Sequence, residues 1–187
     1  MADSSDLPHS LPLSRRVLLR YAAFTATASL AAPLALARRS EQRTLTFIHT
    51  HTGEKLVAPY LQGDCYQAAC LAQVNHFLRD FRTGEVHAID PALLDMLFDL
   101  QVRADREAPF EVISGYRSPA TNSKLHRKST GVASHSLHME GKAIDIRLSG
   151  FSTARLRDHA LSLKRGGVGY YQASDFVHVD TGRVRFW

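Results

Sequence analysis

The residues best suited to chemistry lie in two short stretches of the last third of the chain, residues 136–145 and 175–178. His138, Asp145 and His178 offer two imidazoles and a carboxylate, a donor set that can bind one divalent ion and leave a position open for water. Two neutral imidazoles and one carboxylate leave such a site positively charged, so a zinc ion there could polarise a carbonyl and activate water. On spacing alone, the three residues could equally be unrelated.

Three further side chains could assist such a site. Asp175 is three residues before His178 and, if it does not bind metal, could take a proton from the attacking water and pass it to the leaving amine. Arg117 follows a predicted strand and could donate hydrogen bonds to the scissile carbonyl or the oxyanion. Asp180 lies on the same strand face as His178, where it could orient the imidazole or simply form a surface salt bridge.

Other kinds of nucleophile find less support. Ser114 and Ser118 flank Arg117, but neither lies in a Ser-x-x-Lys or Gly-x-Ser-x-Gly context, which argues against a serine enzyme. Cys65 and Cys70 are the only thiols, and neither has the setting of a catalytic cysteine. A disulfide between them and two free thiols both remain open, because a bridge requires their Cα atoms to be close.

The elements that would position these residues can be read from hydrophobic patterning. Residues 43–49 and 55–60 alternate like strands around a turn, which predicts a β-hairpin. His49 and His51 share one face of the first strand, and without a third ligand nearby we interpret them as exposed strand residues.

The rest of the chain mixes helices with strands. Helices are predicted at residues 66–81, 91–100 and 152–164, the second beginning at Asp90-Pro91 and the third ending at Gly166-Gly167. The predicted strands are residues 110–114, 143–148, 168–171, 176–180 and 184–187. This order predicts an α+β fold, a single domain with a small curved antiparallel sheet flanked by helices and the metal site on the sheet.

The first 37 residues have the layout of an export signal. Arg15-Arg16 precede an uncharged, Ala- and Leu-rich run at residues 21–37, which ends in Ala35-Leu36-Ala37 before charge resumes. The paired arginines favour the twin-arginine route, with Sec export also open. A membrane anchor would need roughly 20 apolar residues, so this shorter run predicts only transient contact with the membrane. The predicted organisation is an export signal at 1–37 and a catalytic domain at 38–187, located in the periplasm.

Composition narrows the classes further. A hydrophobic share of 44% with 22% charged residues is typical of a globular protein rather than a disordered one. The net charge of +5 is spread along the chain without a lysine or arginine block, so no nucleic-acid partner is expected. Weak attraction to a carboxylate-rich cell-wall polymer and a merely solvated basic surface both fit this charge.

Taken together, the motifs resemble those of the zinc D-alanyl-D-alanine peptidase family, and within it most strongly those of the periplasmic murein endopeptidases. The resemblance spans almost the whole chain. It rests on Ser114-Gly-Tyr-Arg-Ser118, on Ser136-x-His138-x-x-Gly141-x-Ala143-x-Asp145 and on Asp175-x-x-His178.

This resemblance implies a fold like that of Hedgehog and D-Ala-D-Ala peptidase domains, with Zn²⁺ held by the two histidines and Asp145. It also implies Asp175 as general base, Arg117 as stabiliser of the transition state and Ser136 as a substrate-binding residue. The implied substrate is peptidoglycan, cut at cross-links between stem peptides. Phe176 stands where some relatives carry a histidine. A D-alanyl-D-alanine carboxypeptidase and a non-catalytic, zinc-bearing cell-wall-binding module are the alternatives.

Overall fold

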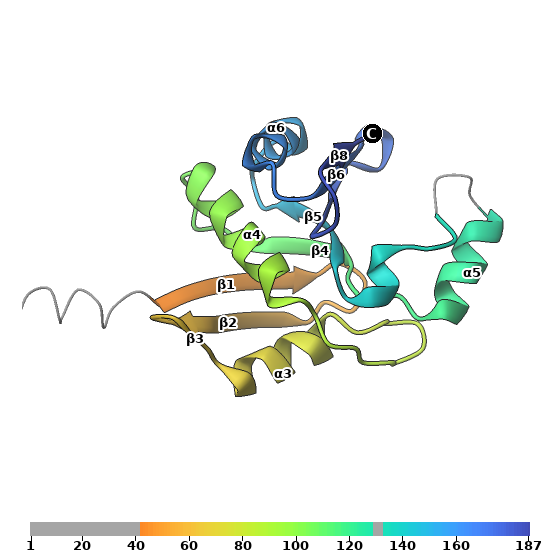
Figure 1. Ribbon diagram of the computed structural model, residues 1–187, viewed down its shortest axis with the longest axis horizontal. Helices are drawn as coiled ribbons and strands as arrows, with labels where there is room; N and C mark the ends of the chain where they lie inside the picture. Colours follow the sequence, from red (N-terminus) through yellow and green to blue (C-terminus); the bar gives the residue numbers. More distant parts are fainter. Residues whose placement is uncertain (1–41, 129–132) are drawn as a thin grey trace, which may run out of the picture. The chain divides into compact units, whose positions relative to one another are not determined.

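The computed structural model describes residues 42–128 and 133–187, so the predicted export signal lies outside the described residues. The described chain forms an eight-stranded sheet in the order β3-β2-β1-β4-β5-β7-β6-β8 (Figure 1). Its strands are β1 (Gln42–His49), β2 (Lys55–Gln62), β3 (Cys65–Tyr66), β4 (Phe110–Ser114), β5 (Ala143–Leu148), β6 (Gly167–Tyr171), β7 (Phe176–Asp180) and β8 (Arg185–Phe186). The central strands β4, β5 and β7 are therefore neighbours although they are far apart in the sequence.

The sheet is larger than the predicted one and is mixed rather than antiparallel. β1 pairs in parallel with β4, and β6 pairs in parallel with β8. The other pairings are antiparallel. Long helical connections allow parallel neighbours, and the chain passes through two helices between β3 and β4. The α+β class is thus confirmed, whereas the small antiparallel sheet is wrong, because local alternation does not reveal which strands become neighbours.

Four α-helices fall within the described residues, namely α3 (Ala68–Phe77), α4 (Pro91–Arg103), α5 (Pro119–Lys128) and α6 (Thr153–Leu163). Asp90 lies directly before α4, and its side chain accepts a hydrogen bond from the amide of Ala92 in the first turn, which confirms the predicted helix start. α6 ends at Leu163, and the next residue, Lys164, has a left-handed conformation. This end lies shortly before the glycine pair that was predicted to end the helix. None of the helices in these two ranges is both long and apolar enough to cross a membrane.

The two faces of the sheet have different tasks. Side chains along a strand alternate between the faces, and one face of β5 and β7 joins the hydrophobic core that α3, α4 and α6 also line. The core-facing residues of these two strands are Ile144, Ile146, Leu148, Val177 and Val179. Asp145 and His178 occupy the intervening positions and so point to the opposite face. The site is therefore built on a surface whose reverse side is a packed apolar core.

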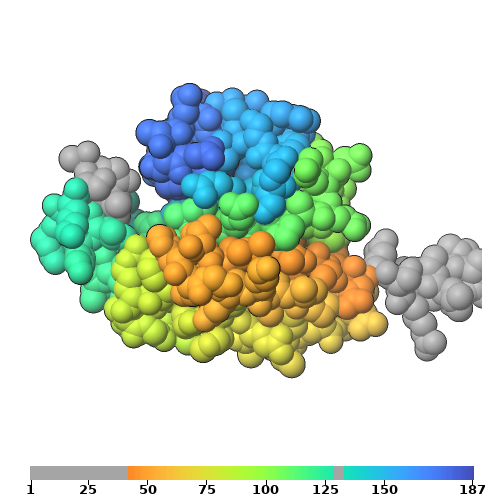
Figure 2. Space-filling model, turned by 180° about the vertical axis from the view of Figure 1, so that it is seen from behind, coloured from red at the N-terminus to blue at the C-terminus, as the bar shows by residue number. Residues whose placement is uncertain are grey.

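Seen from behind, the green residues of α4 and β4 lie between the orange N-terminal hairpin and the blue C-terminal elements (Figure 2). This agrees with the position of β4 in the strand order, between β1 and β5. Figure 1 also shows α5 standing away from the sheet.

The predicted hairpin is confirmed by β1 and β2, but one of its histidines lies elsewhere than expected. His51 is exposed, whereas His49 is only 1% exposed. The interpretation of His49 as an exposed residue is wrong because it shares a strand face with Leu45 and Phe47, which belong to the core. Its ring packs against Phe77 of α3 at 6.0 Å between centroids.

The two cysteines are free thiols, with Cys65 exposed on β3 and Cys70 buried in α3. Of the two alternatives left open by the sequence, the structure therefore contains the unbridged one. Burial raises the pKa of the Cys70 thiol, which keeps it protonated and unreactive.

Candidate metal centre

The register between two central strands brings the first pair of predicted ligands together. β5 and β7 run antiparallel with Asp145 directly opposite His178. His138 joins them from a short 3-10 helix, η1 (Leu137–Glu140), which leads into β5. All three residues are at most 7% exposed, and their donor atoms form a group that could hold a metal ion.

The distances within this group suit one ion. His138 Nε2 lies 3.2 Å from His178 Nδ1 and 3.2 Å from Asp145 Oδ1. His178 Nδ1 lies 2.9 Å from the same carboxylate oxygen. Ligands bound to zinc at about 2.0–2.1 Å in a tetrahedral arrangement lie about 3.3 Å apart. The three donor atoms therefore approximate one face of such a coordination sphere and leave a fourth position free.

The partners of the outer ring nitrogens turn both imidazoles in the required sense. His138 Nδ1 lies 2.7 Å from the Gly115 carbonyl oxygen, and His178 Nε2 lies 3.1 Å from Asp180 Oδ2. Since both of these oxygens can only accept, each outer nitrogen carries a hydrogen, and in the neutral, ligating form of each ring the inner nitrogen has the lone pair. The inner nitrogens then present lone pairs to Asp145 Oδ1. Three lone pairs at this distance repel one another unless a cation lies between them, so the donor set fits a metal.

The electrostatics favour the ligating forms of Asp145 and His138. Burial alone raises the pKa of Asp145, but His138, His178 and Arg117 outweigh burial and hold this pKa well below its usual range. Burial also lowers the pKa of His138, which favours the neutral ring. For His178, burial lowers the pKa, but hydrogen bonds with Asp145 and Asp180 outweigh it and the net shift is upward.

Asp180 holds His178 in place. Its carboxylate is fully buried and accepts hydrogen bonds from the backbone amides of Gly167 and Gly182 as well as from Arg185. Burial raises the pKa of Asp180, but these bonds and His178 outweigh burial, so the group stays ionised. Of the two interpretations left open for Asp180, its contacts fit the one in which it orients the His178 imidazole, and its ion pair with Arg185 is not a surface salt bridge because the carboxylate is buried.

Arg117 lies on the other side of the group. Its Nη2 donates to Asp145 Oδ2 and its Nε donates to Ser114 Oγ at 2.9 Å. The backbone amide of Arg117 donates to the His138 carbonyl at 3.2 Å. The guanidinium thus fixes the free oxygen of the carboxylate ligand and still faces the cavity.

The loop that carries Arg117 is held from behind by the segment after α3. Asp80 is fully buried and accepts from the backbone amide and the hydroxyl of Ser118 at 3.0 and 2.7 Å. The Tyr116 amide donates to the Leu78 carbonyl at 2.8 Å. Arg117 is thus placed by buried hydrogen bonds on both of its neighbours in the sequence.

Ser136 and Gly141 bracket η1. The Ser136 hydroxyl accepts from the His138 amide at 3.4 Å, and the side chain also lines the cavity. Gly141 ends η1 with a φ of 66°, and a Cβ there would overlap the Ala88 carbonyl. Only glycine combines this conformation with such a close approach, which allows the chain to turn between two ligands.

Asp175 is not brought into the cavity. Its side chain is 66% exposed, its Oδ1 accepts from Thr153 Oγ1 at 2.6 Å, and Arg147 lies 3.5 Å from its Oδ2. An odd separation of three residues from His178 favours opposite faces of an extended strand, and Phe176 instead points to the cavity. The role of Asp175 as general base stays a prediction.

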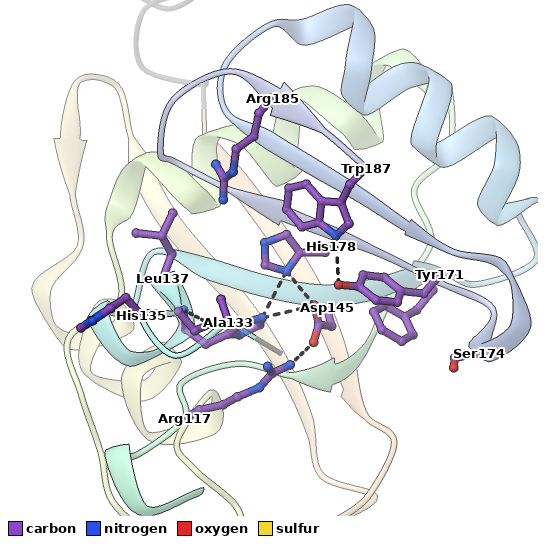
Figure 3. Close-up of a pocket in the computed structure, with 13 residues that line it drawn as sticks. Arg117, Ala133, His135, Leu137, Asp145, Tyr171, Ser174, His178, Arg185 and Trp187 are labelled. Atoms are coloured by element: carbon purple, nitrogen blue, oxygen red, sulfur yellow. Dashed lines mark hydrogen bonds and ion pairs between the residues drawn. The ribbon is translucent and has the colours of Figure 1, made fainter. Parts of the chain in front are cut away.

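The cavity over the metal group has a volume of about 570 Å³. Figure 3 shows Arg117 below the ligands, Trp187 and Tyr171 on one side, Leu137 and His135 on the other, and Arg185 above. Four of the lining residues were not predicted from the sequence as site residues, namely His135, Tyr171, Arg185 and Trp187. The sequence indicated these residues only through their positions, because each lies beside a motif or in a predicted strand.

Known proteins are similar to this chain over most of its length. Residues 37–187 match the family described as Peptidoglycan L,D-endopeptidase MepK. The chain is 45% identical over 145 residues to the proteins named Peptidoglycan L,D-endopeptidase MepK of Escherichia coli (strain K12) and Shigella flexneri, covering 78% of this chain and 80% of each relative. It is 43% identical over 155 residues to the Probable peptidoglycan L,D-endopeptidase MepK of Haemophilus influenzae, covering 82% and 83%. The family match includes every element that carries a candidate site residue.

Proposed function

The chain belongs to the family of the peptidoglycan L,D-endopeptidase MepK, which confirms the predicted family, and from this premise we propose that it is a zinc-dependent endopeptidase that hydrolyses peptide cross-links in peptidoglycan. The cross-links we propose are those between two meso-diaminopimelate residues and those between D-alanine and meso-diaminopimelate. Cutting such bonds would serve cell-wall remodelling.

One observation carries the proposal. Two imidazoles with their outer nitrogens tied to acceptors turn lone pairs toward one carboxylate oxygen, at 3.2 and 2.9 Å. With both rings neutral, this arrangement leaves lone pairs facing one another, and a metal ion bound between them would relieve that repulsion. It opens onto the cavity, where an extended peptide can reach it.

A zinc ion held by His138, Asp145 and His178 would supply a Lewis acid that polarises the scissile carbonyl and lowers the pKa of water. The chain itself supplies the orientation. Gly115 and Asp180 fix the two imidazoles, and Arg117 fixes the carboxylate.

Arg117 and Ser136 would act on the substrate directly. The guanidinium retains N–H donors beyond those bound to Ser114 and Asp145, and these can meet the oxygen on which negative charge develops. Ser136 lines the same cavity and can hydrogen-bond a backbone group of the stem peptide through its hydroxyl.

Asp175 remains our proposed general base, which requires its carboxylate to leave the contacts observed in this structure. To take a proton from water in the cavity, its carboxylate must leave Thr153 and turn past the backbone of Phe176. The variant Asp175→Asn keeps an acceptor oxygen for Thr153 and removes the basicity. A fall in kcat with unchanged stability supports this role. An unchanged kcat points to another group, and His135 is the imidazole lining the cavity besides the ligands in the described chain.

The substrate sets the location of the protein. Peptidoglycan lies outside the cytoplasmic membrane, so this activity requires export, and we propose the periplasm as its location. The paired arginines and apolar run of residues 1–37 support this proposal through the predicted twin-arginine signal.

The decisive experiment uses purified protein and defined muropeptides. We expect metal-depleted protein to leave cross-linked dimers intact and to regain cleavage with one equivalent of zinc, with products identified by mass spectrometry. Calorimetric zinc binding on the same sample gives a readout independent of activity.

The alternatives give different outcomes in this assay. A D-alanyl-D-alanine carboxypeptidase would trim uncross-linked pentapeptides and leave dimers intact. A non-catalytic module would bind zinc and peptidoglycan without releasing products. Cleavage of dimers that persists after complete metal removal would contradict the proposed mechanism.

A further inference from the structure

Arg185 lines the cavity on the side opposite Arg117 and is held rigidly there. Its Nη1 and Nη2 donate to the two oxygens of the buried Asp180 carboxylate at 3.0 and 2.7 Å. A third hydrogen bond runs from Nη1 to the Arg183 carbonyl at 3.1 Å. The strand pairing of Arg185 with Gly167 fixes its backbone.

These contacts leave one edge of the guanidinium open. An arginine side chain has five N–H donors, and the bonds above use both hydrogens of Nη1 and one of Nη2. Within residues 42–128 and 133–187, no acceptor takes the Nε hydrogen or the second Nη2 hydrogen. These two donors point along the same edge, which is the geometry that binds a carboxylate through both oxygens.

The surroundings of this edge form an aromatic wall. The Trp187 ring lies 5.0 Å from Arg185 Cζ, and its Nε1 donates to Tyr171 Oη at 3.0 Å. Tyr171 stacks on Phe176 with 4.5 Å between centroids. At Gly169, an added Cβ would lie 2.7 Å from the Trp187 ring, so the ring fits only because this residue has no side chain. The wall offers an apolar surface for the aliphatic part of a ligand next to a cation.

The charges around the cavity also favour an anionic ligand. Arg117 and Arg185 both line it, and among the described lining residues Asp145 has the sole acidic side chain. That carboxylate already faces two imidazoles and Arg117. A metal ion would add further positive charge. The cavity therefore has cationic capacity that its own acid does not neutralise.

We propose that the open edge of Arg185, beside the Trp187 wall, binds a free carboxylate of the substrate and so selects stem peptides that carry one. This inference rests on the proposed function, because the peptide bound at the metal centre is then one whose diaminopimelate residue has a carboxylate and an aliphatic chain. Arg185 is a specificity-determining residue, while Arg117 acts at the scissile bond.

The test compares two matched substrates, cross-linked muropeptide dimers with the diaminopimelate carboxylate either free or amidated. Zinc-loaded wild-type protein is expected to prefer the free acid. Arg185→Gln is expected to lower kcat/KM for the free acid by about ten- to hundredfold, mainly through KM, which is the range for a lost hydrogen bond to a charged group. The rate on the amidated dimer is also expected to fall, because Arg185 holds Asp180 beside His178, but by a much smaller factor, so most of the preference disappears. Arg183→Gln removes the same charge from an exposed neighbour outside the cavity and is expected to retain the preference.

The outcomes separate this inference from the proposed function. Equal losses on both substrates with reduced zinc content mean that Arg185 acts only by holding Asp180, which overturns the inference and leaves the endopeptidase intact. A wild-type protein that cleaves both dimers equally also overturns it. If zinc-loaded wild-type protein cleaves neither dimer, the proposed function fails and the inference fails with it. Arg185→Lys keeps the charge without the planar edge, and partial recovery of the preference is expected from a variant that folds like the wild type.

Discussion

Two regions of the sheet bury histidines, and they treat the imidazole in opposite ways. In the hairpin, His49 Nδ1 accepts from the amides of His51 and Thr52 at 3.2 and 3.4 Å, while the buried Nε2 finds no hydrogen-bond partner among the described residues. In the metal group, the outer nitrogens of His138 on η1 and His178 on β7 donate to acceptors and the inner ones face a carboxylate. Burial alone therefore does not mark a metal ligand. The mark is an acceptor on the outer nitrogen and other lone pairs in front of the inner one.

The electrostatics follow the same division. Burial lowers the pKa of His49, and the nearby His51 lowers it further, so this ring is a neutral part of the core. The pKa of His178 moves upward despite burial because two carboxylates flank it. The hairpin uses a histidine as a packing residue, whereas η1 and β7 place histidines in a group that could hold a metal ion.

The largest effect is expected from Asp145→Asn, which tests whether the buried group of His138, Asp145 and His178 is the metal site. The change removes the anionic centre toward which both inner nitrogens point, so we expect zinc affinity to fall by more than about a hundredfold, beyond the range for residues that only orient ligands. Cleavage of cross-linked dimers should fall below detection. Calorimetry and metal analysis measure the first effect, and product mass analysis measures the second. Zinc binding at wild-type affinity would show that the cluster is not the metal site.

Arg117→Ala should separate chemistry from metal binding. We expect kcat to fall by about a hundred- to a thousandfold, the range for removing one donor to a developing oxyanion. Zinc content should stay near one equivalent, because all three ligands remain. A matched loss of zinc and activity would instead assign Arg117 to holding Asp145.

Asp80→Asn tests the support that the segment after α3 gives to the loop carrying Arg117. Burial raises the pKa of Asp80, but hydrogen bonds from Thr121, Ser118 and Arg82 outweigh burial and lower it overall. The ionised group therefore stabilises the fold above the unfolded pKa of about 3.9, and this contribution is lost as the pH falls through the lower folded value.

At neutral pH we expect Asp80→Asn to lower the free energy of unfolding by about 1–3 kcal/mol, the range for hydrogen bonds to a charged group. The difference from wild type should shrink below about pH 4, where the unfolded carboxyl takes up its proton. Urea unfolding of the metal-free proteins at several pH values measures this. An equal deficit at acidic and neutral pH would mean that the carboxylate charge is unimportant. A smaller fall in kcat should accompany the change because Ser118 adjoins Arg117.

The smallest expected effect is that of His49→Gln, which sharpens the comparison. The side-chain oxygen can still accept from the turn amides, and we expect the free energy of unfolding to change by about 1–2 kcal/mol, since a well-packed ring is replaced. Zinc affinity and kcat should remain within about twofold of wild type. Thermal unfolding and calorimetry measure these quantities, and a large loss of zinc would place His49 in the metal site after all.

The sequence predicted the parts of the molecule that depend on local pattern. The hairpin, the start of α4 at Asp90 and the strands β5 and β7 follow from alternation and capping, and motif resemblance brought together His138, Asp145 and His178. The parallel pairing of β1 with β4 was not predictable in this way, because it depends on contacts between distant segments. The burial of His49 was missed although local alternation places it on the strand face of Leu45 and Phe47, and Phe77 of α3 completes its surroundings.

The site shows the same limit of local pattern. Asp175 was predicted beside the ligands from its spacing to His178, but a left-handed φ of 50° and the hydroxyl of Thr153 direct its carboxylate elsewhere. Arg185 and Trp187 carry no motif of their own. They reach the cavity because β8 pairs with β6, a contact that no periodicity in the sequence indicates.

The position of β7 between β5 and β6 affects when the metal group can form during synthesis of the chain. While the polypeptide is still leaving the ribosome, the segment with His138 and Asp145 emerges first and offers only a bidentate, weakly chelating pair. His178 arrives late in translation, and its strand must insert next to β5 before the third donor is in place. Metal capture would thus coincide with completion of the sheet, so nascent chains would be unable to hydrolyse anything.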